Sequence, residues 1–263
     1  MAFLWLLSCF TLTGASLGSG APASDPELSI TPRIINGMNA RPGSWPWHVS
    51  LQTSSGIIFC GGSLISKSWV ITAAHCNVTT SDLVVGGQYD LNSPEDSRQI
   101  LKIAQIFIHP KFNMNAVYSD IALLKLEEAA HIHRTVSLVL LPSVDDHFPP
   151  GALCSVLGWG DTQLNSDKIP DTLQQAYVPL LSLSTCRKYW PRIITKSLIC
   201  AGLQGSCSCR GDSGGSLSCM KSGVWTLVGV MSFASKTCPT NKPIVATRVS
   251  TFIPWVQNVL AHN

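Results

Sequence analysis

The segment DIALLKL, residues 120 to 126, is a short apolar run that begins with one acidic residue, Asp120. Similar runs recur at residues 47–52 (WHVSLQ), 68–72 (SWVIT), 82–87 (DLVVGG), 154–159 (CSVLGW) and 224–233 (VWTLVGVMSF). Each run is bounded by Gly, Ser, Asn, Asp or Pro, which is typical of short strands joined by turns. The pattern predicts an all-β barrel or sandwich, built as one large or two small β domains.

The composition agrees with a β-rich globular chain. Of its 263 residues 45% are hydrophobic and 13% are charged, which excludes intrinsic disorder. The 20 Gly and 16 Pro residues are spread along the chain, which argues against a helical bundle. One amphipathic helix is expected from Phe252 to about Ala261, with Pro254 in its first turn. The net charge is +3 and no long Lys/Arg block occurs, so we expect no nucleic-acid partner.

The N-terminus reads as two segments that precede the folded domain. An apolar run from Met1 to about Leu12, followed by Ser16 and Gly18, predicts a secretory signal peptide at 1–18. The alternative is a buried N-terminal strand or helix. Residues 19–33 are polar and end in Arg33 before an apolar pair, which indicates a short propeptide with a basic cleavage site. No other apolar run is long enough to span a bilayer, so a secreted protein without a membrane anchor is expected.

The ten cysteines fit an oxidising compartment. Cys9 falls in the signal peptide, which leaves an odd number, so one cysteine is free or pairs outside the chain. Zinc binding is the competing use, but no CxxC pair occurs and Cys207-Ser208-Cys209 is a weak metal signal. We therefore expect no metal and no cofactor.

The segment GDSGG, residues 211 to 215, sets Ser213 among glycines, where backbone N–H groups can face an oxyanion. It also satisfies the GxSxG pattern of hydrolases, but that pattern requires an acid and then a histidine downstream, and only His262 follows. Upstream, TAAHC contains His75 and YSDIALLKL contains Asp120. The order His75, Asp120, Ser213 is one of the known orders of a catalytic triad.

These motifs resemble the chymotrypsin family of serine proteases, and the resemblance covers nearly the whole chain. The matching segments are RIING (33–37), SWPWHVSL (44–51), CGGSLIS (60–66), TAAHC (72–76), SDIALLKL (119–126), GWG (158–160) and GDSGG (211–215). The resemblance implies two packed six-stranded antiparallel β-barrels with a C-terminal α-helix. The first barrel would span 34–140, and the second barrel with the helix would span 141–263.

The resemblance also implies the role of each site residue. Ser213 would be the nucleophile, His75 the general base and Asp120 the group that orients it, with the N–H groups of Gly211 and Ser213 as the oxyanion hole. In isolation each triad residue also has a structural reading, as a packed histidine, a turn or capping aspartate and a loop serine.

Activation is implied by the same resemblance. A trypsin-like protease would cut after Arg33, and the new Ile34 ammonium would pair with buried Asp212, since a buried charge needs a partner. An exposed acidic loop residue is the alternative for Asp212.

Four disulfides follow from the resemblance: Cys60–Cys76, Cys154–Cys219, Cys186–Cys200 and Cys209–Cys238. Ser19 and Leu140 stand where chymotrypsinogens carry the cysteines of a propeptide bridge, so the propeptide should be released on activation. These four pairs leave Cys207 without a partner. It is either the small apolar floor of the specificity pocket or a reactive thiol. A third alternative is that Cys207 replaces Cys209 as the disulfide partner of Cys238.

The specificity pocket departs from the family pattern. Cys207 replaces Ser or Asp, the segment Ser232-Phe233-Ala234 replaces Ser-Trp-Gly, and Ile244 replaces Gly or Ala. These changes narrow the pocket and favour an elastase-like preference for small aliphatic side chains. Arg210 at the pocket mouth is either a solvated arginine or a group that favours acidic substrate side chains.

Two surface features remain. Asn77-Val78-Thr79 is an N-glycosylation sequon, occupied or left unmodified beside the disulfide and His75. The loop around Glu95 lies where relatives bind calcium, but Gln88 replaces a carboxylate ligand, so a solvated loop is expected.

The sequence as a whole predicts a secreted, monomeric digestive serine endopeptidase, made as a zymogen, that acts on polypeptides. An activating trypsin-like protease and protein protease inhibitors are its implied partners. The alternative is a catalytically impaired homologue that serves as a binding protein.

Overall fold

Short antiparallel strands dominate the computed structural model, as the sequence predicts. It describes residues 37–93, 97–114, 118–160, 170–202, 212–233 and 242–263. All of these residues belong to the unit Thr31–Asn263. None of the helices in this part of the chain is long and apolar enough to cross a membrane.

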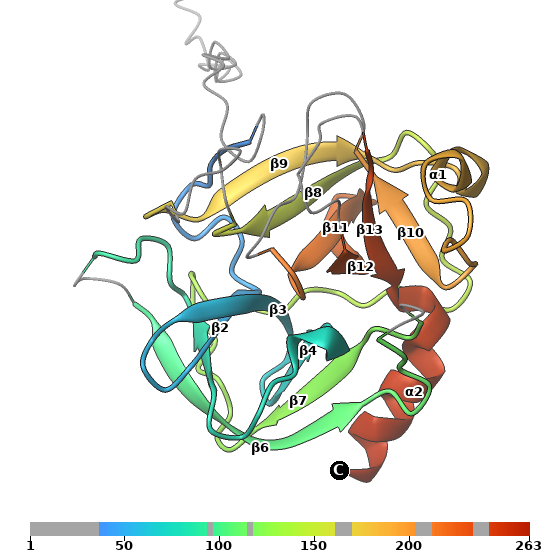
Figure 1. Cartoon of the computed structure of the whole chain (residues 1–263). Coiled ribbons are helices and arrows are strands. Elements are labelled where there is room, and N and C mark those ends of the chain that lie inside the picture. The colour runs from blue at the N-terminus through green and yellow to red at the C-terminus, as the bar shows by residue number, and fades with distance from the viewer. Residues whose placement is uncertain (1–36, 94–96, 115–117, 161–169, 203–211, 234–241) are drawn as a thin grey trace, which may run out of the picture. The chain divides into compact units, whose positions relative to one another are not determined.

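The first half of the domain is a closed six-stranded barrel with strand order β2-β3-β4-β7-β6-β5 (Figure 1). Its strands are β2 (His48–Gln52), β3 (Ile58–Ser66), β4 (Trp69–Thr72), β5 (Leu83–Gly86), β6 (Gln99–Ile108) and β7 (Ala122–Leu126). In β6 the buried Leu101 and Ile103 alternate with the exposed Ile100 and Lys102. This alternation arises because successive side chains of a strand point to opposite faces, so one face of β6 packs into the barrel.

The second half is a seven-stranded sheet with the order β1-β9-β8-β11-β12-β13-β10. Its strands are β1 (Met38–Asn39), β8 (Leu153–Gly158), β9 (Gln174–Pro179), β10 (Leu198–Ala201), β11 (Ser216–Lys221), β12 (Val224–Phe233) and β13 (Ile244–Arg248). A bridge between Leu180 and Ala201 joins the end of β9 to β10, so the strands β8 to β13 curl back on themselves. Strand β1 is added at the outer edge of β9.

The described residues contain a short 3₁₀ turn and two α-helices. They are η1 (Ala74–Cys76), α1 (Leu183–Tyr189) and α2 (Val249–His262). The all-β class and the C-terminal helix are confirmed, but α2 begins three residues earlier than expected, so Pro254 lies in its second turn. Helix α1 was not predicted. Its N-cap is Ser182, whose hydroxyl accepts a hydrogen bond from the Thr185 N–H at 3.0 Å.

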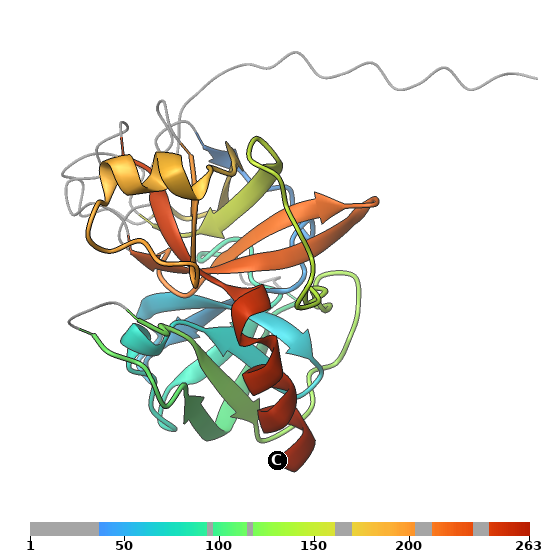
Figure 2. The same ribbon diagram turned by 90° about the vertical axis from the view of Figure 1, so that its right-hand side faces the viewer.

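Helix α2 connects the two halves of the domain. It follows β13 directly and runs along the first barrel (Figure 2). Its buried residues Phe252, Ile253 and Val256 belong to the same hydrophobic cluster as the barrel interior. The imidazole of His109 contacts Phe252 and Trp255 edge to face, each with ring centroids 5.0 Å apart. The helix therefore fixes the first barrel to the end of the second sheet.

The alternation in β6 gives a test of its register. We expect Ile103→Ala to lower the free energy of unfolding by about 2–5 kcal/mol, because Ile103 is 1% exposed and its loss leaves a cavity. The matched change Ile100→Ala on the same strand should cost less than about 1 kcal/mol, since Ile100 is 58% exposed. Chemical denaturation measures both values, and equal losses would contradict the assigned faces.

Candidate active site

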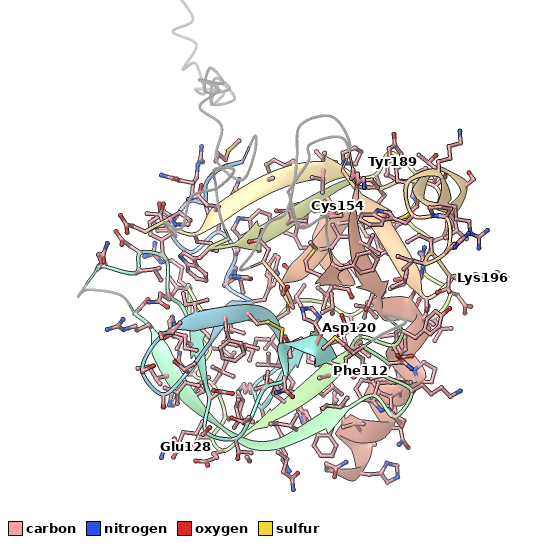
Figure 3. All side chains as sticks on the ribbon, in the orientation of Figure 1. Phe112, Asp120, Glu128, Cys154, Tyr189 and Lys196 are labelled. Atoms are coloured by element: carbon pink, nitrogen blue, oxygen red, sulfur yellow. A yellow bond between two sulfur atoms is a disulfide. The ribbon has the colours of Figure 1, made fainter. Side chains whose placement is uncertain are left out.

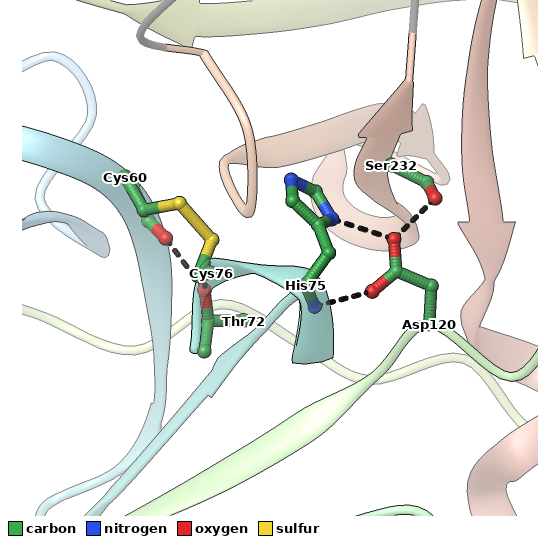
Figure 4. Close-up of a disulfide and its surroundings, with 7 residues drawn as sticks. Cys60, Thr72, His75, Cys76, Asp120 and Ser232 are labelled. Carbon is green, nitrogen blue, oxygen red and sulfur yellow. Dashed lines mark hydrogen bonds and ion pairs between the residues drawn. A yellow bond between two sulfur atoms is a disulfide. The ribbon is translucent and has the colours of Figure 1, made fainter. Parts of the chain in front are cut away.

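A buried carboxylate organises the site. Asp120 lies two residues before the start of β7 and is 1% exposed. Its Oδ1 accepts a hydrogen bond from the His75 backbone N–H at 2.9 Å, and its Oδ2 accepts one from His75 Nδ1 at 2.7 Å (Figure 4). This pair of contacts sets both the position and the ring orientation of His75. It also leaves Nε2 as the nitrogen available for proton transfer, because Nδ1–H is held by the carboxylate.

The second half of the domain supplies a third donor to the same carboxylate. Ser232, on β12, donates from its hydroxyl to Asp120 Oδ2 (Figure 4). Thr247, on β13, donates from Oγ1 to the Asp120 backbone carbonyl at 2.8 Å. A buried carboxylate requires such donors, since burial of an unpaired charge is strongly unfavourable. The carboxylate therefore joins the first barrel to the second sheet at the site.

Ser213 lies in the turn Asp212–Gly215, which precedes β11, and it is partly buried. Both halves of the domain hold this turn. The Gly61 N–H of β3 donates to the Ser213 carbonyl at 2.7 Å, and the Gly214 N–H donates to the Met231 carbonyl of β12 at 2.8 Å. Backbone contacts on both sides thus position the serine.

Glycine is required at position 214 in this turn. Gly214 has φ +76°, a conformation that L side chains rarely adopt. A Cβ there would also lie 2.3 Å from Thr72 Oγ1 and 3.1 Å from Cys76 Sγ, in the segment that carries His75. Ser213 and His75 therefore lie on segments that pack directly against each other.

Asp212 is directed into the interior, where it is 3% exposed. Its Oδ1 accepts a hydrogen bond from the Gly160 N–H at 3.0 Å. A Cβ on Gly158 would lie 2.0 Å from the same oxygen. The first residue of the GWG segment therefore has to be glycine, because the carboxylate packs against it. The sequence-based alternative of an exposed acidic loop residue is wrong.

Three of the four expected disulfides are present in the described residues: Cys60–Cys76, Cys154–Cys219 and Cys186–Cys200. The first connects β3 to the η1 turn that carries His75. Its sulfurs and the His75 ring lie within 4.8 Å of one another, but the oxidised sulfurs offer no thiolate to a metal.

The expected pocket residues are only partly described. Ser232 and Phe233 end β12, and Ile244 begins β13. Ile244 is 2% exposed and packs in a cluster with Met231 and Ala246. Its side chain is therefore part of the core of the second sheet.

Several expected site residues lie outside the described residues. They are Arg33, Ile34, Cys207, Cys209, Arg210, Gly211, Ala234 and Cys238. Asn77 is described: it is exposed and ends η1 in the left-handed conformation, with φ 49°.

Sequence reasoning missed His48, which lies beside the serine turn. His48 is 4% exposed, and its ring lies tilted against Trp159 with centroids 5.4 Å apart. Neither ring nitrogen has a hydrogen-bond partner within the described ranges. Burial lowers the pKa of His48 to about 4, so the ring is neutral at pH 7. The segment WPWHVSL offered only an apolar strand pattern, which does not distinguish a buried histidine from an exposed one.

A carboxylate that orients an imidazole, beside a serine on a glycine-rich turn between two β halves, is the arrangement of a serine endopeptidase. Comparison with known proteins agrees with this class. A family model described as trypsin matches residues 34–256. The human protein chymotrypsin-like elastase family member 3B is 40% identical over 271 aligned positions, which cover 98% of each chain. The chain belongs to the trypsin family of chymotrypsin-like serine proteases.

The buried His48 predicts an acid-sensitive contribution to stability. The unfolded state takes up a proton near pH 6.5 and the folded state only near pH 4, so this contribution is complete above pH 6.5 and declines as the pH falls toward 4. In a Ser213→Ala background, which prevents self-digestion, His48→Gln should remove up to about 1.4 kcal/mol per pH unit from the slope in this interval.

Denaturant unfolding at each pH measures this slope. His147→Gln is the matched control, because His147 is exposed. The same pH slope in His48→Gln and the parent protein would contradict the assignment.

Proposed function

We propose that this chain is a secreted digestive endopeptidase, made as a zymogen, in which Ser213, His75 and Asp120 act as the catalytic triad. The observation that carries the proposal is the pair of hydrogen bonds from His75 to the buried carboxylate of Asp120, at 2.9 and 2.7 Å. They hold the imidazole in the tautomer that a general base requires. The human relative with elastase in its name supports a proteolytic role.

In the proposed reaction, Ser213 Oγ attacks the peptide carbonyl while His75 Nε2 takes its proton. The same proton passes from His75 to the leaving amine as the acyl-enzyme forms. Water, with its proton taken by His75, then attacks the acyl-enzyme, and the proton returns to Ser213 Oγ as the carboxylic acid product leaves. The N–H groups of Gly211 and Ser213 would stabilise the oxyanion. Asp120 would hold the imidazole in place and stabilise the imidazolium.

Activation would begin with removal of the signal peptide 1–18 and cleavage after Arg33 by a trypsin-like protease. The new Ile34 ammonium would pair with Asp212, whose carboxylate is buried and also binds the Gly160 N–H. Leu140 carries no thiol, so nothing at this position would retain the propeptide 19–33 through a disulfide. The mature enzyme would act as a monomer on polypeptides and be open to protein inhibitors.

The proposed preference is for small aliphatic side chains. Phe233, which stands where the family carries Trp, directly follows Ser232 at the end of β12 and supports this preference. Ile244 packs in the core of the second sheet and does not itself carry it. Cys207 offers no charge that would attract Lys or Arg.

Cleavage specificity provides the test. The recombinant zymogen is activated with trypsin, the trypsin is blocked, and a diverse peptide library is digested beside a Ser213→Ala control. We expect cleavage after Ala, Val or Leu that is absent in the control. Cleavage after Tyr or Phe would overturn the pocket assignment. No Ser213-dependent cleavage, with Ile34 as the N-terminus, would overturn the catalytic proposal in favour of a binding role.

We further propose that Asn77 carries an N-linked glycan when the chain is secreted. Asn77 is exposed two residues from His75, and Thr79 lies in a surface turn closed by Asp82. Zymogen secreted from mammalian cells should shift in mobility after treatment with an N-glycosidase. The shift should vanish in Thr79→Ala and persist in Thr79→Ser, which keeps the sequon. An unshifted parent protein would contradict the proposal.

A further inference from the structure

Acidic residues are almost absent from the C-terminal third of the chain. Between Asp171 and the C-terminus the sequence contains one, Asp212, and its carboxylate is buried. The same segment is rich in Lys and Arg. Six of these basic residues lie on or contact helix α1 and the segment that follows it, and we call them the basic face: Arg187, Lys188, Arg192, Lys196, Lys242 and Arg248.

Hydrogen bonds to the backbone of the 190–198 segment bring the basic face together. Arg187, in the last turn of α1, donates from Nε to the Ile194 carbonyl at 3.3 Å. Arg248, at the end of β13, donates to the carbonyls of Lys196 and Leu198 at 3.0 and 3.1 Å. Figure 3 shows Lys196 and Tyr189 on the α1 side of the second sheet. Five of the six side chains are exposed, and Arg248 is half-buried.

Acidic groups in the described ranges do not neutralise the basic face. The ion pairs found there are His75 with Asp120 and Lys221 with Asp146, and neither includes a member of the face. Like charges held close together without counter-charges are unfavourable in the free protein. They create a positive potential that an acidic ligand would relieve.

A short series of contacts connects the basic face to the catalytic carboxylate. Ser232 donates to Asp120, and the next residue, Phe233, packs edge to face against Trp190 with ring centroids 5.3 Å apart. Trp190 directly follows α1 as its C-cap, and its Nε1 donates to the Pro243 carbonyl at 3.2 Å. The Lys242 ammonium lies 5.3 Å from the centroid of the same indole. The side chain of Trp190 therefore lies between Phe233, which follows the Asp120 donor Ser232, and Lys242 of the basic face.

We propose that the basic face is an extended substrate-binding surface that selects polypeptides with acidic residues outside the scissile bond. This inference rests on the proposed endopeptidase function. Lys242 is positioned by the indole of Trp190, which also packs against Phe233, the neighbour of Ser232. The cations of α1 and of the segment after it extend the positive surface from there. A substrate carboxylate in this region gains attraction both in the encounter and in the complex. Because the contact is distant from the reacting carbonyl, it lowers KM and leaves kcat nearly unchanged.

Matched peptides test the proposal with the activated full-length enzyme. Each pair shares one scissile bond from the library digest and differs by three Asp or three Asn residues, placed on either side of that bond. We expect kcat/KM for the better Asp peptide to exceed its Asn partner about tenfold in low salt, mainly through KM. The ratio should fall toward one at about 0.5 M salt, where screening is strong.

Charge-matched variants separate a local effect from net charge. The triple variant Arg187→Gln, Lys188→Gln, Lys242→Gln should reduce the Asp/Asn ratio to about twofold or less. The control Lys67→Gln, Lys102→Gln, Arg134→Gln removes the same charge from exposed positions of the first barrel and should keep the ratio. The ratio within each variant is the readout, so a general change in folding or activity cancels.

The outcomes are distinct. An Asp/Asn ratio near one in the parent enzyme, or an equal fall in both triple variants, overturns the proposal. Loss of heparin binding in the basic-face variant with an unchanged peptide ratio also overturns it, in favour of a docking surface for sulfated polysaccharide. If neither peptide is cut in a Ser213-dependent manner, the proposed endopeptidase function itself fails.

Discussion

The buried carboxylate of Asp120 is the constraint on which the rest of the site depends. A carboxylate at 1% exposure needs hydrogen-bond donors, and the structure supplies them from both halves of the domain: His75 from the first barrel and Ser232 from the second sheet. The contacts that satisfy the charge also orient the imidazole. Stability and chemistry are therefore linked, because separating the two halves would leave a buried charge without its partners.

The serine turn is positioned by backbone packing, which explains its glycines. Gly214 has a positive φ and approaches Thr72 and Cys76 so closely that no side chain fits. Hydrogen bonds from Gly61 and to Met231 attach the turn to one strand of each half. Asp212 leaves the turn in the opposite direction, into the interior, where Gly158 makes room for it. Adjacent residues thus supply a partly buried serine and a buried carboxylate, and each requires a nearby glycine.

Charge is distributed unevenly over the molecule. The net charge of +3 is small, yet the C-terminal third has a single acidic residue, which is buried, and several exposed cations around α1. Trp190 connects this surface to the active-site border through Phe233 on one side and Lys242 on the other. The contact with the Trp190 indole gives Lys242 a defined position relative to Phe233 and Ser232, which a solvated lysine elsewhere on the surface does not have.

The sequence by itself determined the all-β class, the C-terminal helix and the order of His75, Asp120 and Ser213, because these depend on local periodicity and short motifs. Its six apolar runs correspond to β2, β4, β5, β7, β8 and β12, whereas the other strands were not among them. It placed Ser232 in the pocket wall but did not indicate its hydrogen bond to Asp120, 112 residues away. The sequence also did not indicate the burial of His48, and it predicted that α2 begins at Phe252, three residues after its actual start at Val249. Tertiary structure alone decided these features, since burial, donor geometry and the clustering of the basic face arise from segments that are distant in sequence. The burial of the Ile244 side chain was also decided by the tertiary structure, because the register of β13 against its neighbours directs this residue into the core.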